Sequence, residues 1–166
     1  TFVAQPRVHR QAWRLRSFSQ DMHDRGLRPS SRILEIAQEV ASPDIARALG
    51  VSPGARVILV RRERLADDRP MALERTLLIP ACAAVLGADL ERGSLHEALA
   101  DLGYRPAVAR GTIRPEPAGA EDAETFEVPL GEPLLVETRL VYDAGGTPVE
   151  HTESRYSPRR YVLDIE

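Results

Sequence analysis

Residues 17–65 recur in altered form 77 residues further along the chain. Eleven positions are identical without a gap, where composition alone gives roughly 3–4 identities. The identical pairs are Ser17/Ser94, Gly26/Gly103, Arg28/Arg105, Pro29/Pro106, Ile36/Ile113, Glu39/Glu116, Ala41/Ala118, Ala46/Ala123, Val51/Val128, Gly54/Gly131 and Arg62/Arg139. We interpret this as an internal duplication whose two copies face a shared cleft. A coincidence of a biased composition is the alternative.

Each copy begins with a pattern typical of a helix start. Ser17 and Ser94 are followed three residues later by Gln or Glu, a capping box in which side chains satisfy free backbone N–H groups. Gly26 and Gly103 then stand where a left-handed residue ends a helix. Second, shorter helices are expected over residues 43–49 and 120–126.

Alternating apolar residues bounded by turn residues predict the strands of each copy. Extended segments are expected over 32–40 and 108–113, and two β-hairpins pair 56–65 with 71–79 and 134–142 with 149–156. The order helix, strand, helix, hairpin, repeated once, predicts an α+β fold: a mostly antiparallel sheet covered by helices and internally duplicated.

Residues 1–16 show no clear period and are interpreted as a connector from an upstream domain, with residues 17–166 forming one folded domain. The chain carries 22 Lys+Arg and 25 Asp+Glu, a net charge of −3, and every cation is arginine. Codon usage in a GC-rich genome explains such an excess without any ligand. The slightly acidic balance argues against nucleic-acid binding by this segment, which requires a basic face.

Several classes of site and location are set aside by motif and composition. No apolar run approaches the roughly 20 residues that span a bilayer, so we expect a cytoplasmic protein without a membrane partner. No His or Cys spacing indicates a metal site, no motif indicates a catalytic nucleophile, and no cofactor is expected. The single cysteine, Cys82, is expected to be a half-buried, unreactive thiol.

Two arginines share one face of a predicted strand. Period-two alternation continues the apolar face of Ile58 and Val60 with Arg62 and Arg64, whose guanidiniums then lie about 7 Å apart along the strand. Guanidinium binds phosphate or carboxylate in a planar, bidentate manner, so the pair predicts an anion site. A solvated strand end with Glu63 or Glu74 as counter-ion is the alternative.

Carboxylates and a helix start add further candidates for a binding site. Glu74 lies in the first return strand, and Glu150 shares a face with Tyr156 in the second. These carboxylates can accept hydrogen bonds from sugar or amine donors, or serve as ion-pair partners of arginine. Ser94 can cap its helix and still donate to a ligand, with simple capping as the alternative.

Motifs along about residues 15–164 resemble the UTRA effector-binding domain of the HutC subgroup of GntR-type bacterial transcription regulators. They are Ser17-Phe18-Ser19 with Gly26 and Pro29, Leu49-Gly50-Val51, Arg62 with Arg64, Pro70 with Glu74, Gly93-Ser94-Leu95-His96, Pro133-Leu134-Leu135, Pro148-Val149-Glu150, Arg155-Tyr156 and Arg160-Tyr161. The resemblance implies a chorismate lyase-like fold and a homodimer. It also implies that residues 1–16 are the end of the wing and the linker of a winged helix-turn-helix domain, through which operator DNA is bound.

The resemblance further implies a pocket for a small anionic effector, such as a sugar phosphate or an organic acid. Its residues around the anion are Phe18, Ser19, Arg62, Arg64, Ser94 and His96, with Glu74, Glu150 and Tyr156 toward the rest of the ligand. The sequence departs from the family twice. His96 stands where tyrosine is common, which can make the anion contact pH-sensitive, and Ser157-Pro158-Arg159-Arg160 replaces the usual Arg-Gly-Asp-Arg.

These observations leave three functional hypotheses. The first is an effector-sensing and dimerisation domain of a transcription regulator, with repression as the expected mode, and no enzymatic activity. The second is a chorismate lyase-like enzyme acting on an aromatic carboxylate. The third is a dimerisation module whose pocket no longer binds a ligand.

Overall fold

The computed structural model describes residues 8–11 and 15–164, and its elements follow the repeat. The first copy comprises α1 (Phe18–Asp24), β2 (Pro29–Val40), α2 (Pro43–Leu49), β3 (Arg56–Ala66) and β4 (Arg69–Leu78). The second comprises α3 (Leu95–Asp101), β5 (Pro106–Pro117), α4 (Ala120–Phe126), β6 (Pro133–Asp143) and β7 (Pro148–Tyr156). Adding 77 to the bounds of α1, β2, α2 and β3 gives the bounds of α3, β5, α4 and β6, so the duplication is structural.

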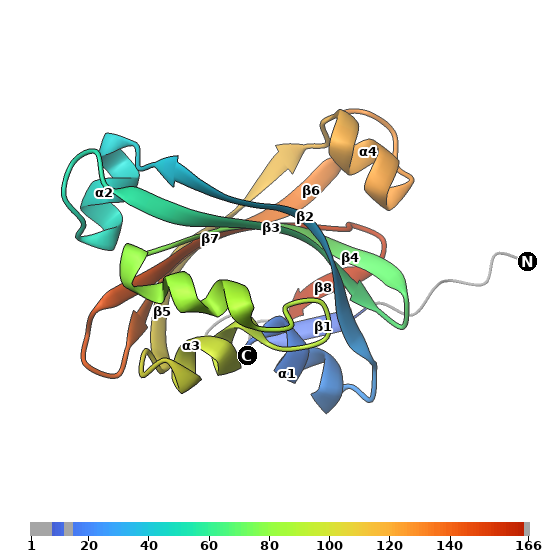
Figure 1. The fold of residues 1–166 in the computed structure, drawn as a ribbon. Coiled ribbons are helices and arrows are strands. Elements are labelled where there is room, and N and C mark those ends of the chain that lie inside the picture. Colours follow the sequence, from blue (N-terminus) through green and yellow to red (C-terminus); the bar gives the residue numbers. More distant parts are fainter. Residues whose placement is uncertain (1–7, 12–14, 165–166) are drawn as a thin grey trace, which may run out of the picture.

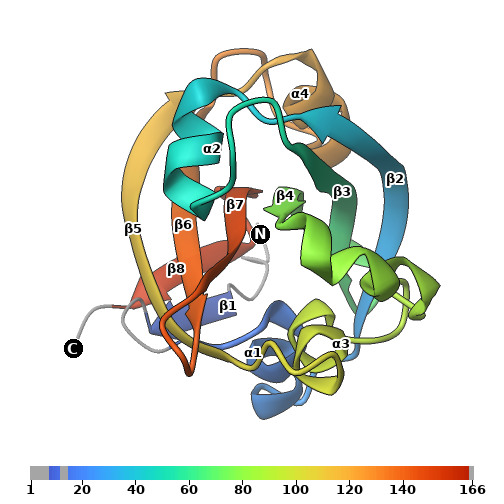
Figure 2. The same ribbon diagram turned by 60° about the vertical axis from the view of Figure 1, so that its left-hand side comes forward.

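The six strands among the ten repeated elements build one sheet. The strand order is β2-β3-β4-β7-β6-β5, and all neighbouring strands are antiparallel. Figure 2 shows the sheet strongly curved, with β2 and β5 at its two edges. The predicted α+β class with a mostly antiparallel sheet is confirmed.

The helices lie on two sides of the sheet and link the copies. In Figures 1 and 2, α2 and α4 lie on one side at opposite ends, and α1 and α3 lie on the other. Helix α2 of the first copy contacts β7 of the second, and α4 of the second contacts β4 of the first. Each copy therefore covers strands of the other, and the largest core cluster contains residues of both copies.

The two copies are related by a pseudo-twofold axis through the centre of the sheet. Arg62 of β3 lies opposite Glu74 of β4, and Arg139 of β6 lies opposite Thr152 of β7. Each β4 residue is therefore structurally equivalent to the β7 residue 78 places later in the chain, one more than the offset of 77 between β3 and β6. By this correspondence Arg75 is equivalent to Glu153, and these two residues lie directly opposite each other where β4 meets β7.

Three elements were not predicted. Strand β1 (Val8–Gln11) falls within the expected connector and pairs in parallel with β8 (Tyr161–Asp164) as a separate two-stranded sheet. A 3-10 helix, η1 (Pro80–Gly87), follows β4.

None of the helices in the described part of the chain is long and apolar enough to cross a bilayer.

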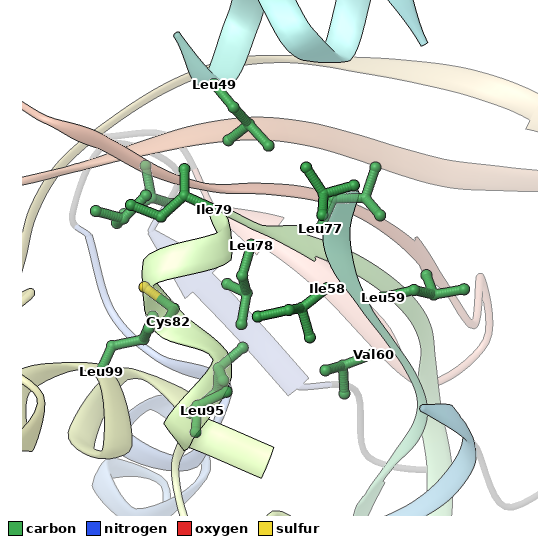
Figure 3. Packing of buried hydrophobic residues seen from close by; sticks show 14 of the residues in the cluster. Leu49, Ile58, Leu59, Val60, Leu77, Leu78, Ile79, Cys82, Leu95 and Leu99 are labelled. Atoms are coloured by element: carbon green, nitrogen blue, oxygen red, sulfur yellow. The ribbon is translucent and has the colours of Figure 1, made fainter. Parts of the chain in front are cut away.

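The largest core cluster joins α2, η1 and α3 to the central strands. Figure 3 shows Leu49 of α2 on one side of the strands, with Cys82 and Leu99 on the other. The expectation of a half-buried thiol is wrong, because Cys82 is fully buried. This burial, together with the charges of Glu150 and Asp143, raises the pKa of the thiol to about 11, so it stays protonated at neutral pH.

Candidate functional site

A pocket opens where the starts of α1 and α3 approach the middle of the sheet. The space between its lining residues is about 260 Å³ including open solvent, and about 10 Å³ of it is open to the centre of a water molecule. Three pairs of repeat-equivalent residues line it: Ser17/Ser94, Phe18/Leu95 and Arg62/Arg139. Because both members of each pair face the same space, the pocket lies on the pseudo-twofold axis. The expected cleft shared by the two copies is therefore present.

Arg62 and Arg64 project from β3 into this pocket, as strand periodicity predicts. Their side chains are only 2% and 4% exposed. Arg62 Nε donates to Glu74 Oε1 at 3.1 Å, and Arg62 Nη2 contacts the same oxygen. Arg64 Nη1 lies 3.6 Å from that oxygen. Glu74 is therefore the counter-ion of the pair, whereas Glu63 forms an ion pair with Arg32 at 2.6 Å.

The charges in this cluster shift one another's protonation. Burial by itself raises the pKa of Glu74, but the attraction of Arg62 and Arg64 outweighs it and lowers that pKa to about 2. Burial and repulsion from Arg62 lower the pKa of Arg64 to about 9, so its guanidinium remains charged at neutral pH. At neutral pH the cluster thus holds two cations and one carboxylate.

Helix α1 positions Arg64. Its Nη2 donates to Ser19 Oγ at 3.3 Å, and its guanidinium carbon lies 4.5 Å from the centre of the Phe18 ring. The ring face attracts the cation, and the hydroxyl accepts one of its hydrogen bonds. Ser17 caps α1 by accepting from Gln20 N at 3.1 Å, which fixes both contact residues relative to β3.

The opposite wall of the pocket is formed by His96 of α3 and Glu150 of β7. His96 Nε2 lies 3.1 Å from Glu150 Oε2, and Thr152 donates to Glu150 Oε1 at 2.5 Å. Burial raises the pKa of Glu150, but the charge and hydrogen bond of His96 outweigh it and lower that pKa overall. Ser94 caps α3, accepting from Glu97 N at 3.4 Å.

Three buried guanidinium nitrogens in the pocket lack an acceptor. Within the part of the chain that the structure describes, Arg62 Nη1, Arg64 Nε and Arg139 Nε form no hydrogen bond. Buried donors of this kind are costly unless an acceptor meets them. The arrangement therefore offers hydrogen-bond donors to an oxyanion. No group of three or more His, Cys, Asp or Glu among the same residues could hold a metal ion.

The structure brings together most of the predicted site residues. Seven of the nine line the pocket: Phe18, Arg62, Arg64, Glu74, Ser94, His96 and Glu150. Ser19 adjoins it through its hydrogen bond with Arg64. Tyr156 does not line it, because its hydroxyl donates to Glu137 Oε2 at 2.9 Å and its ring stacks on Tyr161 at 4.1 Å.

The predicted site omits Ser17, Leu95 and Arg139, which also line the pocket. Arg139 could have been predicted from the sequence, because it is the repeat equivalent of Arg62.

The divergent segment at residues 157–160 lies outside the pocket: Ser157 is buried, and Arg160 Nη1 donates to the Pro70 carbonyl at 3.0 Å.

Comparison with known proteins places this geometry in a family. The model of the UTRA domain matches residues 24–162. The chain is 30% identical over 164 residues to the HTH-type transcriptional repressor NagR of Bacillus subtilis (strain 168), covering 98% of this chain and 68% of the relative. Across NagR and three further curated regulators, the chain spans 58% to 68% of the length of the relative.

Solved structures share the fold. The crystal structure of PhnF from Mycobacterium smegmatis superposes with a TM-score of 0.90 at 21% identity, over 99% of this chain and 73% of that one. The ligand-binding domain of a proposed GntR-family transcriptional regulator from Bordetella bronchiseptica has a TM-score of 0.71 at 26% identity, over 80% of this chain and 85% of that one. The curated relatives are regulators by name, which bears out a regulatory domain over an enzyme. The chain therefore belongs to the UTRA domain family, as an effector domain of a GntR-type transcription regulator.

Proposed function

We propose that the pocket on the pseudo-twofold axis binds a small anionic metabolite, such as a sugar phosphate, and that this binding controls a HutC-type repressor. The observation that carries the proposal is the set of three buried guanidiniums with unmet donors. An oxyanion supplies the missing acceptors, and Glu74 and Glu150 can accept hydrogen bonds from hydroxyl or amine groups of the same ligand.

The proposed control uses the position of the pocket between the two copies. Binding favours one of two arrangements of the dimer, which differ in the spacing of the upstream DNA-binding domains, and the difference in the ligand's affinity for the two arrangements sets the size of the response. We place the end of the wing and the linker in residues 1–16 and the effector domain in residues 17–166. Operator DNA is then bound by an N-terminal domain, in a cytoplasmic homodimer formed through the effector domain.

The test is a thermal-shift screen against sugar phosphates, organic acids and inorganic phosphate. At least one anion should raise the melting temperature of the chain, and Arg64→Gln should abolish that shift. Arg61→Gln is the matched control, because Arg61 is the neighbour of this pair in β3 and forms an ion pair with Glu121 at 2.7 Å instead of lining the pocket.

Two results would count against the proposal. If no anion in the screen shifts the melting temperature, the chain is a dimerisation module without a working pocket. If an anion stabilises Arg64→Gln as strongly as the parent chain, it binds somewhere else. Retention of the parent far-ultraviolet circular dichroism by each variant shows that the fold is intact.

A further inference from the structure

Arg139 reaches the pocket from the second copy. It lies in β6, opposite Gly111 on one side and Thr152 on the other. Its side chain is 10% exposed and lines the same pocket as its repeat equivalent, Arg62. Strands β3 and β6 are separated by β4 and β7, so the two arginines approach the pocket from opposite sides of the central strand pair.

The contacts of Arg139 do not account for its burial. Its ion pair, from Nε to Glu137 Oε2, measures 3.7 Å, which is longer than a hydrogen bond. Glu137 Oε2 already accepts the hydroxyl of Tyr156 at 2.9 Å. Arg139 Nε is buried without an acceptor. The side chain therefore carries a charge into the protein interior with a donor left unmet.

Another arginine shows how this fold pairs a guanidinium for structural purposes. Arg155 donates from Nε to Asp122 at 2.9 Å, from Nη1 to Glu116 at 2.6 Å and from Nη2 to the Pro117 carbonyl at 3.1 Å. All three of its nitrogens have acceptors. Arg139, although more buried than Arg155, has no comparable set.

The charges that line the pocket leave room for an anion. Three guanidiniums face two carboxylates, Glu74 and Glu150. Glu74 is already bonded to Arg62, and Glu150 accepts from Thr152 and contacts His96. Neither carboxylate has a hydrogen bond to Arg139 among the described contacts. The carboxylate that Arg139 does approach is that of Glu137, at 3.7 Å, and this ion pair leaves Arg139 Nε without an acceptor.

We infer that Arg139 is a third anion-binding residue of the pocket, so that both copies of the repeat hold the same oxyanion. The inference rests on the proposed function and specifies the chemistry of its ligand. Three donors reaching in from two sides match a tetrahedral phosphoryl group, which has three terminal oxygens and a charge near −2. A carboxylate presents two oxygens in one plane and meets fewer of these donors.

The inference is tested by calorimetric titration of the 166-residue chain with inorganic phosphate, at low ionic strength and near pH 8. Arg139→Gln should weaken phosphate binding by about tenfold or more, as expected for loss of a hydrogen bond between charged groups. Arg110→Gln is the control, since Arg110 is exposed on the adjacent strand β5 and stacks on Tyr142. This control should bind phosphate as the parent chain does.

A second variant separates binding from folding. Arg139→Gln leaves Glu137 buried without its cation, so the single variant can lose stability for that reason alone. In Arg139→Gln/Glu137→Gln both charges are removed together, which should restore the fold. This double variant should still bind phosphate about tenfold or more weakly than the parent. Glu137→Gln alone keeps Arg139 and should bind phosphate at least as tightly as the parent.

The outcomes distinguish the inference from the proposed function. If Arg64→Gln loses phosphate binding but the folded double variant binds like the parent, the pocket stands and the role of Arg139 is overturned. If the parent chain does not bind inorganic phosphate, the inference is also overturned. The proposed function survives that second result if another anion still binds in a manner that depends on Arg64.

Discussion

Glu74 holds Arg62 and Arg64 together on the buried face of β3. Both guanidiniums approach the same carboxylate oxygen, and the whole cluster is screened from solvent. Without the carboxylate, two buried cations would repel each other with no protein group between them. Glu74 is thus needed for folding before any ligand arrives, which the sequence alone could not distinguish from a role in hydroxyl recognition.

We expect Glu74→Gln to lower the free energy of unfolding by about 3–5 kcal/mol, because it leaves buried charges without a partner. Sulfate should restore part of that loss, since it can take the place of the carboxylate between the arginines. The measurement is urea unfolding of parent and variant at equal ionic strength, in sodium sulfate and in sodium chloride. A variant that is as stable as the parent in chloride would contradict this account of the cluster.

Acid titration provides the control for that prediction. The pKa of Glu74 falls from its ordinary value of 4.5 to about 2 in the folded chain. A lowered carboxyl pKa contributes stability that is complete above the ordinary value and is lost as the pH falls through the folded value. The parent should therefore lose more stability than Glu74→Gln as the pH is lowered from 4.5 toward 2.

Local sequence patterns predict the position of some site residues and not of others. Period-two alternation places Arg62 and Arg64 on the buried face correctly, because a strand fixes the direction of every second side chain. It also places Tyr156 on the same face of β7 as Glu150, and Tyr156 was predicted to contact the ligand, yet it does not line the pocket. The hydroxyl of Tyr156 turns to Glu137 on the neighbouring strand, a contact that depends on strand pairing and not on local period.

At the scale of elements, Gly111 is required where β5 packs on β6. A Cβ at this position would lie 2.0 Å from the Thr138 carbonyl oxygen and 3.0 Å from the Cα of Arg139. The equivalent residue in the first copy, Leu34, occupies a β-bulge where the register of β2 shifts. The second copy keeps a regular register at this point by having no side chain there.

Gly111→Ala should therefore lower the free energy of unfolding by about 1–3 kcal/mol, the usual cost of forcing atoms into a packed site. Because Gly111 lies opposite Arg139, the variant should also weaken phosphate binding. Urea unfolding and phosphate titration measure the two effects. Gly87→Ala is the control, since no atom beyond its neighbours along the chain lies within 4 Å of its Cβ position. A Gly111→Ala variant as stable as this control would be contrary to the structure.

The elements that the sequence predicted are those with local signals. Helix caps, apolar alternation and turn residues located all four α-helices and both hairpins to within a few residues. In the first hairpin, Asp67 and Asp68 both adopt positive φ, as a two-residue turn of type I′ requires. Strands β1 and β8 are only four residues long and carry no such signals. Their pairing joins segments about 150 positions apart, so no local pattern in the sequence predicts it.

At the scale of the whole molecule, an anion held by both copies should stabilise both. A ligand at 100 times its dissociation constant adds about 2.7 kcal/mol to the free energy of unfolding. Hydrogen exchange measured by mass spectrometry, in sulfate and in chloride of equal ionic strength, should show slower exchange in sulfate over residues 56–78 and 133–156 alike. Slower exchange confined to the first of these segments would contradict binding by both copies.

The antiparallel pairing of Arg75 with Glu153 at the centre of the sheet makes the association of the two copies specific. Residues on a twofold axis face their own equivalents, so two unaltered first copies would set arginine against arginine, and two second copies glutamate against glutamate. Like charges directly opposite on neighbouring strands are destabilising. Divergence at this one position therefore favours pairing of a first copy with a second copy, and disfavours pairing of two identical copies.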